Sequence, residues 1–398
     1  MNEGVTMRNS IGPRDIANFF SPNRIMLGAG AAKEIGSVAK SMGARKALVI
    51  TDPGVANIGL GDEIKESLTS QNLNAEIFDR VELEPPARVV DECAKFIREG
   101  GFDLIVGLGG GSSMDTAKMA SVMSTNDGKI LDYVGMEKFP RKGLPKILLP
   151  TTAGSGAEVT RSAGVTDESQ NTKQAIFSIH NLADIAILDP LLTLSLPSRL
   201  TAETGIDALA HAMESFVSFS ATPFSDILAI EAIRLVSENL PVAFAKGEHL
   251  NARYNMQLAA TLAGLAMASG RSGATHGLAF ILETAFNMGH AKAIAIMLPH
   301  VMEFNKMANQ KKYALIARAM GGSIDGLSDY DAAERSVIRV KNLLKGLQIS
   351  IRLPDYGISM ENLEVLVEGG MKQSGWFIHN PRNLAEDDVR RIYLNAML

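Results

Sequence analysis

Residues 104–113 constrain the fold of this chain more than any other stretch. A continuous apolar run, 104–108, leads directly into Gly109, Gly110 and Gly111, and a helix is predicted to begin at Met114. Apolar residues that follow one another, instead of alternating with polar ones, predict a strand buried on both faces, as in a parallel sheet. The glycines would then form the turn between this strand and the next helix.

The first half of the chain repeats this alternation of strand and helix. Predicted strands cover 24–28, 47–50, 75–79, 104–108 and 147–150, followed by an extended pair at 175–179 and 185–188. Predicted helices cover 31–42, 63–70 and 89–100. Strands that alternate with helices in this way indicate an open α/β sheet.

The pattern changes near Leu196 and Pro197. From there on, periodic segments rich in Ala, Leu and Met predict helices at 201–219, 224–239, 251–270 and 312–320, with few strand signals. The chain has 398 residues, more than the length at which a single hydrophobic core usually stops growing. We therefore expect two domains, an α/β domain at 1–196 and a predominantly helical domain at 197–398.

Charge and composition exclude several classes of protein. The formal net charge is −5 and no basic block occurs, which argues against a nucleic-acid partner. The single cysteine, Cys93, excludes an internal disulfide framework and suits a reducing compartment. Residues 1–13 are polar, and the most apolar later run, 259–268, is shorter than the roughly 20 residues needed to span a bilayer. We expect a cytoplasmic protein without a membrane partner.

The glycine-rich turn is a candidate phosphate site. Backbone without side chains can approach an anion closely, and a helix N-terminus offers unpaired N–H groups. The spacing matches neither the dinucleotide fingerprint nor a Walker loop, so a plain tight turn stays open. Asp52 follows another predicted strand, where a carboxylate would bind a ribose 2′-hydroxyl and repel a 2′-phosphate. The alternative for Asp52 is a helix cap or turn residue.

Asp207 and His211 form a candidate metal-binding pair. Their spacing of four residues places both side chains on one face of a helix, although such pairs often form only a hydrogen bond. Two more imidazoles, His276 and His290, follow small residues. A straight helix would hold these two roughly 21 Å apart at 1.5 Å per residue. Both reach one ion only if the chain bends, and residues 287–289 are the predicted place.

These motifs together resemble the iron-containing (group III) alcohol dehydrogenases. The resemblance rests on the glycine turn 109–112 with Asp115 and Lys118, on the segment 151–160, and on the Asp207, His211, His276 and His290 set. Residues 298–302 and 380–382 also match family segments. The resemblance implies a Rossmann-like NAD-binding domain and an all-helical, metal-binding catalytic domain, the architecture shared with dehydroquinate synthase. It further implies a cleft between the domains, a homodimer and a small alcohol or aldehyde substrate.

The resemblance assigns roles residue by residue. The metal ligands would be Asp207, His211, His276 and His290. The pyrophosphate would lie on Gly110, Gly111 and Ser112, with Asp115 in the same motif, and the rest of the cofactor would be lined by Thr151, Thr152, Ser155 and Lys173. Asp52 matches the position whose carboxylate favours NAD over NADP. Fe²⁺ is the family expectation, while mixed nitrogen and oxygen ligands also suit Zn²⁺ or another divalent ion.

The chain departs from the family pattern beside the expected metal. Phe280 stands where many members have a histidine four residues after the third ligand, so no imidazole relay is expected there. We expect Phe280 and His379 to line the substrate pocket. Trp376 and Phe377 are candidates for the same pocket, with core packing as the alternative. Pro85 and Pro86 replace a Pro-Asn-Pro segment, and His300 is expected to be structural.

The expected function is that of a metal-dependent, NAD(H)-linked alcohol dehydrogenase or aldehyde reductase. A cation held by one carboxylate and neutral imidazoles keeps positive charge and would polarise the substrate oxygen while hydride moves to or from the nicotinamide. One alternative is a lyase of the dehydroquinate synthase type, which would need a basic cluster that 276–290 lacks. Another is a non-catalytic nucleotide-binding or assembly protein. Apolar residues around Phe280 favour a short, weakly polar substrate, with an anionic aldehyde held by Arg271 still open.

Overall fold

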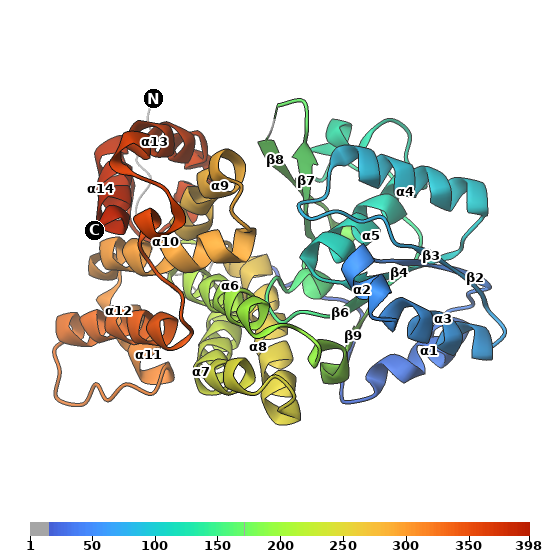
Figure 1. The fold of residues 1–398 in the computed structure, drawn as a ribbon, viewed down its shortest axis with the longest axis horizontal. Helices are drawn as coiled ribbons and strands as arrows, with labels where there is room; N and C mark the ends of the chain where they lie inside the picture. The colour runs from blue at the N-terminus through green and yellow to red at the C-terminus, as the bar shows by residue number, and fades with distance from the viewer. Residues whose placement is uncertain (1–15, 171) are drawn as a thin grey trace. The chain divides into compact units, whose positions relative to one another are not determined.

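A computed structural model describes residues 16–170 and 172–398 of the chain (Figure 1). Its main sheet has six parallel strands in the order β1-β9-β6-β4-β2-β3. In chain order these strands are β1 (Arg24–Leu27), β2 (Lys46–Ile50), β3 (Asn74–Phe78), β4 (Leu104–Gly109), β6 (Lys146–Pro150) and β9 (Ile185–Leu188). The predicted open α/β sheet is confirmed.

Helices cover both faces of this sheet, which explains the continuous apolar runs. Successive side chains of a strand point to opposite faces. Leu48 and Ile105 pack on the side of α4 (Ala87–Gly100) and α5 (Gly111–Met123). Val49 and Val106 pack on the side of α1 (Ile35–Ser41) and α3 (Leu60–Ser70). Both faces therefore require apolar residues at every strand position. A short helix, α2 (Pro53–Asn57), follows β2.

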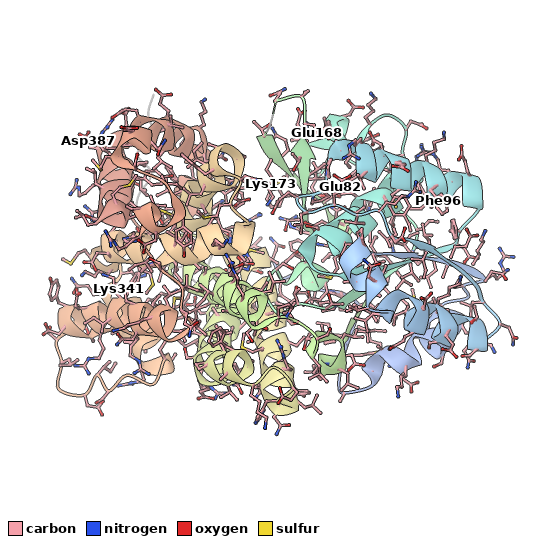
Figure 2. The ribbon with its side chains drawn as sticks, in the orientation of Figure 1. Glu82, Phe96, Glu168, Lys173, Lys341 and Asp387 are labelled. Carbon is pink, nitrogen blue, oxygen red and sulfur yellow. The ribbon has the colours of Figure 1, made fainter. Side chains whose placement is uncertain are left out.

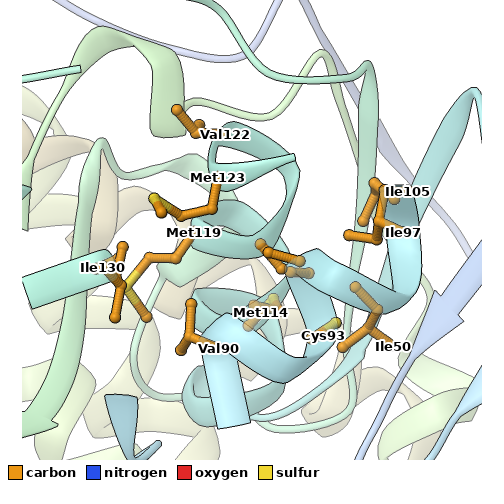
Figure 3. Close-up of a cluster of buried hydrophobic side chains, with 14 of the residues drawn as sticks. Ile50, Val90, Cys93, Ile97, Ile105, Met114, Met119, Val122, Met123 and Ile130 are labelled. Atoms are coloured by element: carbon orange, nitrogen blue, oxygen red, sulfur yellow. The ribbon is translucent and has the colours of Figure 1, made fainter. Parts of the chain in front are cut away.

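The core on the α4 and α5 side also holds the single cysteine (Figure 3). Cys93 is fully buried among Ile50, Val90, Ile97 and Met114. Burial raises the pKa of its thiol far above the usual range. The side chain is therefore a small hydrophobic core residue, as its sequence context predicted.

A second sheet corrects one prediction. The segments 175–179 and 185–188 were expected to form an extended pair, but they belong to different sheets. β8 (Thr172–Phe177) pairs antiparallel with β7 (Ser162–Asp167) and parallel with the short β5 (Gly135–Met136), while β9 lies between β1 and β6. β7 escaped prediction because small and polar residues, including Gly164, hide its alternation of buried Ala163 and Val165 with half-buried neighbours.

The remainder of the chain is helical, as predicted, and no strand occurs among the described residues after Leu188. The long helices are α6 (Ser198–Val217), α7 (Pro223–Ala245), α8 (Leu250–Gly270), α9 (Ala274–Phe286), α10 (His290–Asn305), α11 (Gln310–Ala319), α12 (Asp329–Gly346), α13 (Leu363–Lys372) and α14 (Glu386–Met397). None of the helices in the described part of the chain combines the length and apolarity that crossing a membrane requires.

Packing divides the chain differently from a single cut at residue 196. The sheet unit comprises residues 20–204 and 242–264, and the helical unit comprises residues 205–241 and 265–398 together with the described residues 16–19. The segment 242–264 packs with the sheet unit because side chains of α8 donate hydrogen bonds to backbone carbonyls of that unit. Arg253 donates to the Leu196 carbonyl, and Gln257 donates to the carbonyl of Pro150 at the end of β6.

Candidate functional site

Asp207 and His211 lie one turn apart on α6 in the helical unit. Both side chains are buried, and His211 Nε2 lies 3.8 Å from Asp207 Oδ1. No hydrogen bond joins them, because this distance is too long for one. The carboxylate and the imidazole instead face the same point, as the helical spacing predicted.

The other two imidazoles reach this point because the chain bends between them. His276 is in the first turn of α9, and His290 is the first residue of α10. Asn287 ends α9 in a left-handed conformation with φ of 51°, a geometry that asparagine tolerates better than most residues. The bend predicted at 287–289 is confirmed. His276 Nε2 and His290 Nε2 lie 3.7 Å and 3.8 Å from Asp207 Oδ1.

The donor atoms of this cluster fit a divalent cation. One ligand atom each from Asp207, His276 and His290 lies within 4.8 Å of the others, and His211 joins them through Asp207. Asp207 Oδ1 and His276 Nε2 are buried without a hydrogen-bond partner among the described residues. Buried polar atoms without partners are costly, and a cation between them would satisfy both. The mixed oxygen and nitrogen set suits Fe, Zn, Co or Ni.

Two buried glutamates, which the sequence analysis missed, hold two of the imidazoles. His276 Nδ1 lies 2.5 Å from Glu214 Oε2, and His290 Nδ1 lies 2.6 Å from Glu283 Oε1. The available signal was helical spacing, since Glu214 follows Asp207 by seven residues and Glu283 follows His276 by seven. Each carboxylate can accept a hydrogen bond from Nδ1–H, and the lone pair on Nε2 is then available to a metal.

Burial and these partners shift the pKa values of the cluster in opposite directions. Burial lowers the pKa of His211 to about 4. Burial also opposes charge on His276, but the carboxylates of Glu214 and Asp207 together outweigh it and, with no cation bound, raise the pKa of His276 to about 9. Burial disfavours an ionised Asp207 as well, yet the surrounding imidazoles, His211 foremost, hold the pKa of this carboxyl well below its usual range. Asp207 is therefore a carboxylate at neutral pH.

Aromatic side chains flank the cluster within the helical unit. The Trp376 ring stacks on His276 with 6.4 Å between centroids, and Phe280 packs against Trp376 at 5.6 Å. Phe377 is buried and lies close to Gly277, where an added Cβ would meet its ring at 3.0 Å. Phe280 and Trp376 thus form an apolar wall beside one ligand, while Phe377 serves packing.

The remaining histidines of interest have other partners. His379 Nδ1 lies 2.9 Å from Ser220 Oγ, and burial, followed by the charge of Arg271, lowers the pKa of His379. His300 Nε2 lies 2.8 Å from the Ile351 carbonyl oxygen and is buried. His300 is therefore structural, as expected, and a pocket role for His379 stays a prediction.

In the sheet unit, the glycine turn brings several predicted cofactor residues together. β2, β4 and β6 are neighbours, so Asp52, Gly110 and Thr151 follow adjacent strand ends, where open α/β sheets bind ligands. α5 begins at Gly111 with Gly110 as its N-cap. A Cβ added at Gly111 would lie 3.2 Å from Ser155, and a Cβ added at Gly110 would lie 3.5 Å from Thr152. Glycine is needed most clearly at Gly109, which has φ of 145° and where an added Cβ would lie 2.5 Å from Ser113 Oγ.

Asp52 already has two hydrogen-bond partners. Its Oδ1 accepts from the Val55 N–H and caps α2, and its Oδ2 accepts from Ser113 Oγ at 3.0 Å. The cap that the sequence analysis left open is therefore present. A carboxylate has about four acceptor positions, so the cap is compatible with a ribose contact, which stays a prediction.

Asp115 and Lys173 are also engaged in the sheet unit. Asp115 accepts from the Gly164 N–H at 2.9 Å and from the buried Lys118 at 3.0 Å, which ties α5 to β7. Lys173, labelled in Figure 2, forms an ion pair with Glu84, whose N–H lies 3.3 Å from Ser112 Oγ. The Glu84 backbone, just before Pro85, has φ of 49°. Cofactor roles of Asp115, Ser112 and Lys173 stay predictions.

Comparisons with known proteins agree with these features. The iron-containing alcohol dehydrogenase model matches residues 22–190, and the model of the C-terminal part of the Fe-containing alcohol dehydrogenase family matches residues 201–397. Long-chain-alcohol dehydrogenase 1 of Geobacillus thermodenitrificans is 39% identical over 95% of this chain and 96% of its own length.

Solved structures give the same result. A 1,3-propanediol oxidoreductase aligns with a TM-score of 0.93 and 35% identity, over 96% of this chain and all of that one. The sulfoacetaldehyde reductase of Bifidobacterium kashiwanohense, solved in complex with NAD⁺, aligns with a TM-score of 0.87 and 30% identity, over 96% of this chain and 99% of that one. This chain belongs to the iron-containing alcohol dehydrogenase family.

Proposed function

We propose that this enzyme interconverts a short, weakly polar primary alcohol and its aldehyde with NAD(H), at a divalent metal held by Asp207, His211, His276 and His290. The observation that carries the proposal is the pair of buried metal-binding atoms Asp207 Oδ1 and His276 Nε2, which have no hydrogen-bond partner within residues 16–170 and 172–398. The apolar wall of Phe280 and Trp376 lies beside them. Relatives differ in the substrates that their names state, so the wall, and not the metal set, supports the substrate class.

The protein's own residues hold the reactants and control charge. A divalent cation bound by this donor set supplies Lewis-acid polarisation of the alcohol or carbonyl oxygen, and the nicotinamide accepts or returns hydride. Asp207 contributes a carboxylate because the imidazoles around it lower its pKa. Phe280 offers no proton acceptor where a histidine is usual in the family. We therefore expect the alcohol proton to leave through water or the ribose hydroxyls.

NAD and iron are the proposed cofactors. Asp52 supports NAD, because its carboxylate would repel the 2′-phosphate of NADP, and one structural neighbour was solved with NAD⁺. The family name supports Fe²⁺, and Zn²⁺ is the first alternative because the same ligands bind both metals.

A panel of aldehydes tests the proposal. Metal content is measured first, and each aldehyde is then assayed with NADH and with NADPH. We expect turnover of short, uncharged aldehydes with NADH. Protein that is replete with metal and binds NAD, yet is inert toward every alcohol and aldehyde tried, would overturn it.

An anionic aldehyde is the second candidate substrate. Arg271 adopts φ of 70° two residues before Gly273, and its charge acts on His379, so a cation lies near the start of α9. Sulfoacetaldehyde compared with an uncharged aldehyde of similar size distinguishes the two candidates. Preference for the anion, lost in Arg271→Leu, would favour this one.

We also propose that the enzyme is a cytoplasmic homodimer, which the resemblance to the family supports. Light scattering after gel filtration measures the mass. A single species of twice the chain mass is expected, and a monomer or a larger assembly would contradict the proposal.

A further inference from the structure

The three imidazoles of the candidate metal centre are held unequally. His276 and His290 each have a buried glutamate within 2.6 Å of Nδ1. His211 Nδ1 is also buried but has no hydrogen-bond partner among the described residues. Only two of the three imidazoles are therefore fixed in ring orientation and tautomer by a carboxylate.

Such a carboxylate changes how strongly an imidazole binds a metal. A hydrogen bond from Nδ1–H to the carboxylate of Glu214 or Glu283 keeps the lone pair on Nε2 and raises the basicity of Nε2. The two glutamates also add negative charge around the centre, where the sequence analysis counted only the carboxylate of Asp207. Both effects favour a divalent cation.

Glu214 holds the more buried of the two imidazoles, because the His276 side chain is 5% exposed and that of His290 is 26% exposed. Besides His276, it accepts from the Thr275 N–H at 2.6 Å and from the Gly273 N–H at 3.0 Å. Because Glu214 also lies on α6, it joins the helix of Asp207 to the turn that presents His276.

We infer that Glu214 and Glu283 are positioning residues that set how tightly this centre retains its metal. Glu214 has the larger effect, and His211 is the most weakly held of the three imidazoles. The inference rests on the proposed metal dependence. It concerns residues that bind the Nδ1 side of the imidazoles.

Metal titration of the purified full-length chain tests the inference. Metal is removed by chelation, and Zn²⁺ and anaerobic Fe²⁺ are titrated against a competing chelator. Glu214→Gln and Glu283→Gln keep side-chain volume but remove charge. We expect an affinity loss of about 100-fold for Glu214→Gln and about 10-fold for Glu283→Gln, within the range usual for such outer partners. His211→Ala should lose less affinity than His276→Ala.

Glu158→Gln is the matched control. Glu158 is a buried carboxyl group of the sheet unit that accepts from Thr261 at 2.8 Å, so its substitution also replaces a buried carboxyl group but removes no partner of an imidazole. It should retain wild-type metal affinity. Circular dichroism and NAD titration check that each variant is folded, and Glu214→Asp serves as a charge-conserving second variant that should recover part of the affinity.

The outcomes separate this inference from the proposed function. Folded Glu214→Gln and Glu283→Gln proteins that bind metal like wild type would overturn the inference alone. Equal loss in Glu158→Gln would overturn it too, because the effect would then not depend on the imidazoles. A wild-type chain that takes up no divalent cation would overturn the proposed metal dependence and the inference with it.

Discussion

Asp207 Oδ1 and His276 Nε2 lie 3.7 Å apart, and neither buried atom has a hydrogen-bond partner in the described part of the chain. Two residues that lie 69 positions apart in the sequence thus bring two buried, unpaired polar atoms to face each other. Proteins rarely leave buried polar atoms unpaired. The proposed cation between them would satisfy both atoms.

Asp207→Ala should abolish metal retention and turnover, because it removes a carboxylate that all three imidazoles face. NAD binding should persist, since the predicted cofactor residues belong to the sheet unit. Metal analysis, activity assays and NAD titration measure the three effects. Asp226→Ala, which removes an α7 carboxylate paired with Lys312 at 2.8 Å, is the control and should keep its metal. Full metal content in Asp207→Ala would contradict the assignment.

Phe280→His should shift the substrate preference toward polar aldehydes. The substitution places an imidazole beside Trp376, in a wall that is otherwise apolar. We expect the ratio of kcat/KM for a hydroxylated aldehyde to that for an alkyl aldehyde to rise about tenfold, the scale of a single pocket contact. Phe280→Leu keeps the wall apolar and should retain the wild-type ratio. An unchanged ratio in Phe280→His would show that Phe280 does not determine the choice of substrate.

Asp52→Asn should improve the use of NADPH relative to NADH. Asparagine keeps an oxygen that can accept from the Val55 N–H and cap α2, but it removes the charge that would repel a 2′-phosphate. We expect the ratio of kcat/KM values, NADPH to NADH, to rise at least about tenfold. Asp62→Asn, in the first turn of α3, controls for loss of one negative charge. If both variants behave alike, Asp52 does not select the cofactor.

Because of Lys146, the free energy of unfolding should depend on pH in the alkaline range. Its Nζ is buried and donates to the His180 carbonyl at 2.9 Å, and burial lowers the pKa of Lys146 to about 8 from the model-peptide value of 10.5. Between these two pH values the unfolded chain binds more protons than the folded chain, so stability rises with pH.

The measurement compares urea unfolding at pH 7.5 and 9.5. Relative to Lys146→Met, the wild-type protein should gain about 1–2 kcal/mol over this interval, from about 1.4 kcal/mol per pH unit for one titrating group. Parallel pH dependence of the two proteins would show that Lys146 is fully charged in the fold.

Much of the fold was determined by local pattern. Continuous apolar runs predicted the strands of the parallel sheet because each residue of a strand covered on both faces must be apolar. Periodic segments predicted α6, α8 and α11 to within three residues of their ends, whereas the helix predicted at 224–239 stops six residues before the end of α7. The pairing of β8 with β7 was not predictable, since small and polar residues carry little strand signal.

The same division holds for the metal centre. The sequence by itself determined which residue types could bind a metal, the helical spacing of Asp207 and His211, and the bend before His290. Only the tertiary structure decided which ring nitrogens face the centre and that Glu214 and Glu283 lie behind two of them. The physical reason is distance along the chain. Local spacing reports which face of a helix a side chain occupies, whereas the contact between Glu214 and His276 joins residues 62 positions apart and depends on how separate helices pack.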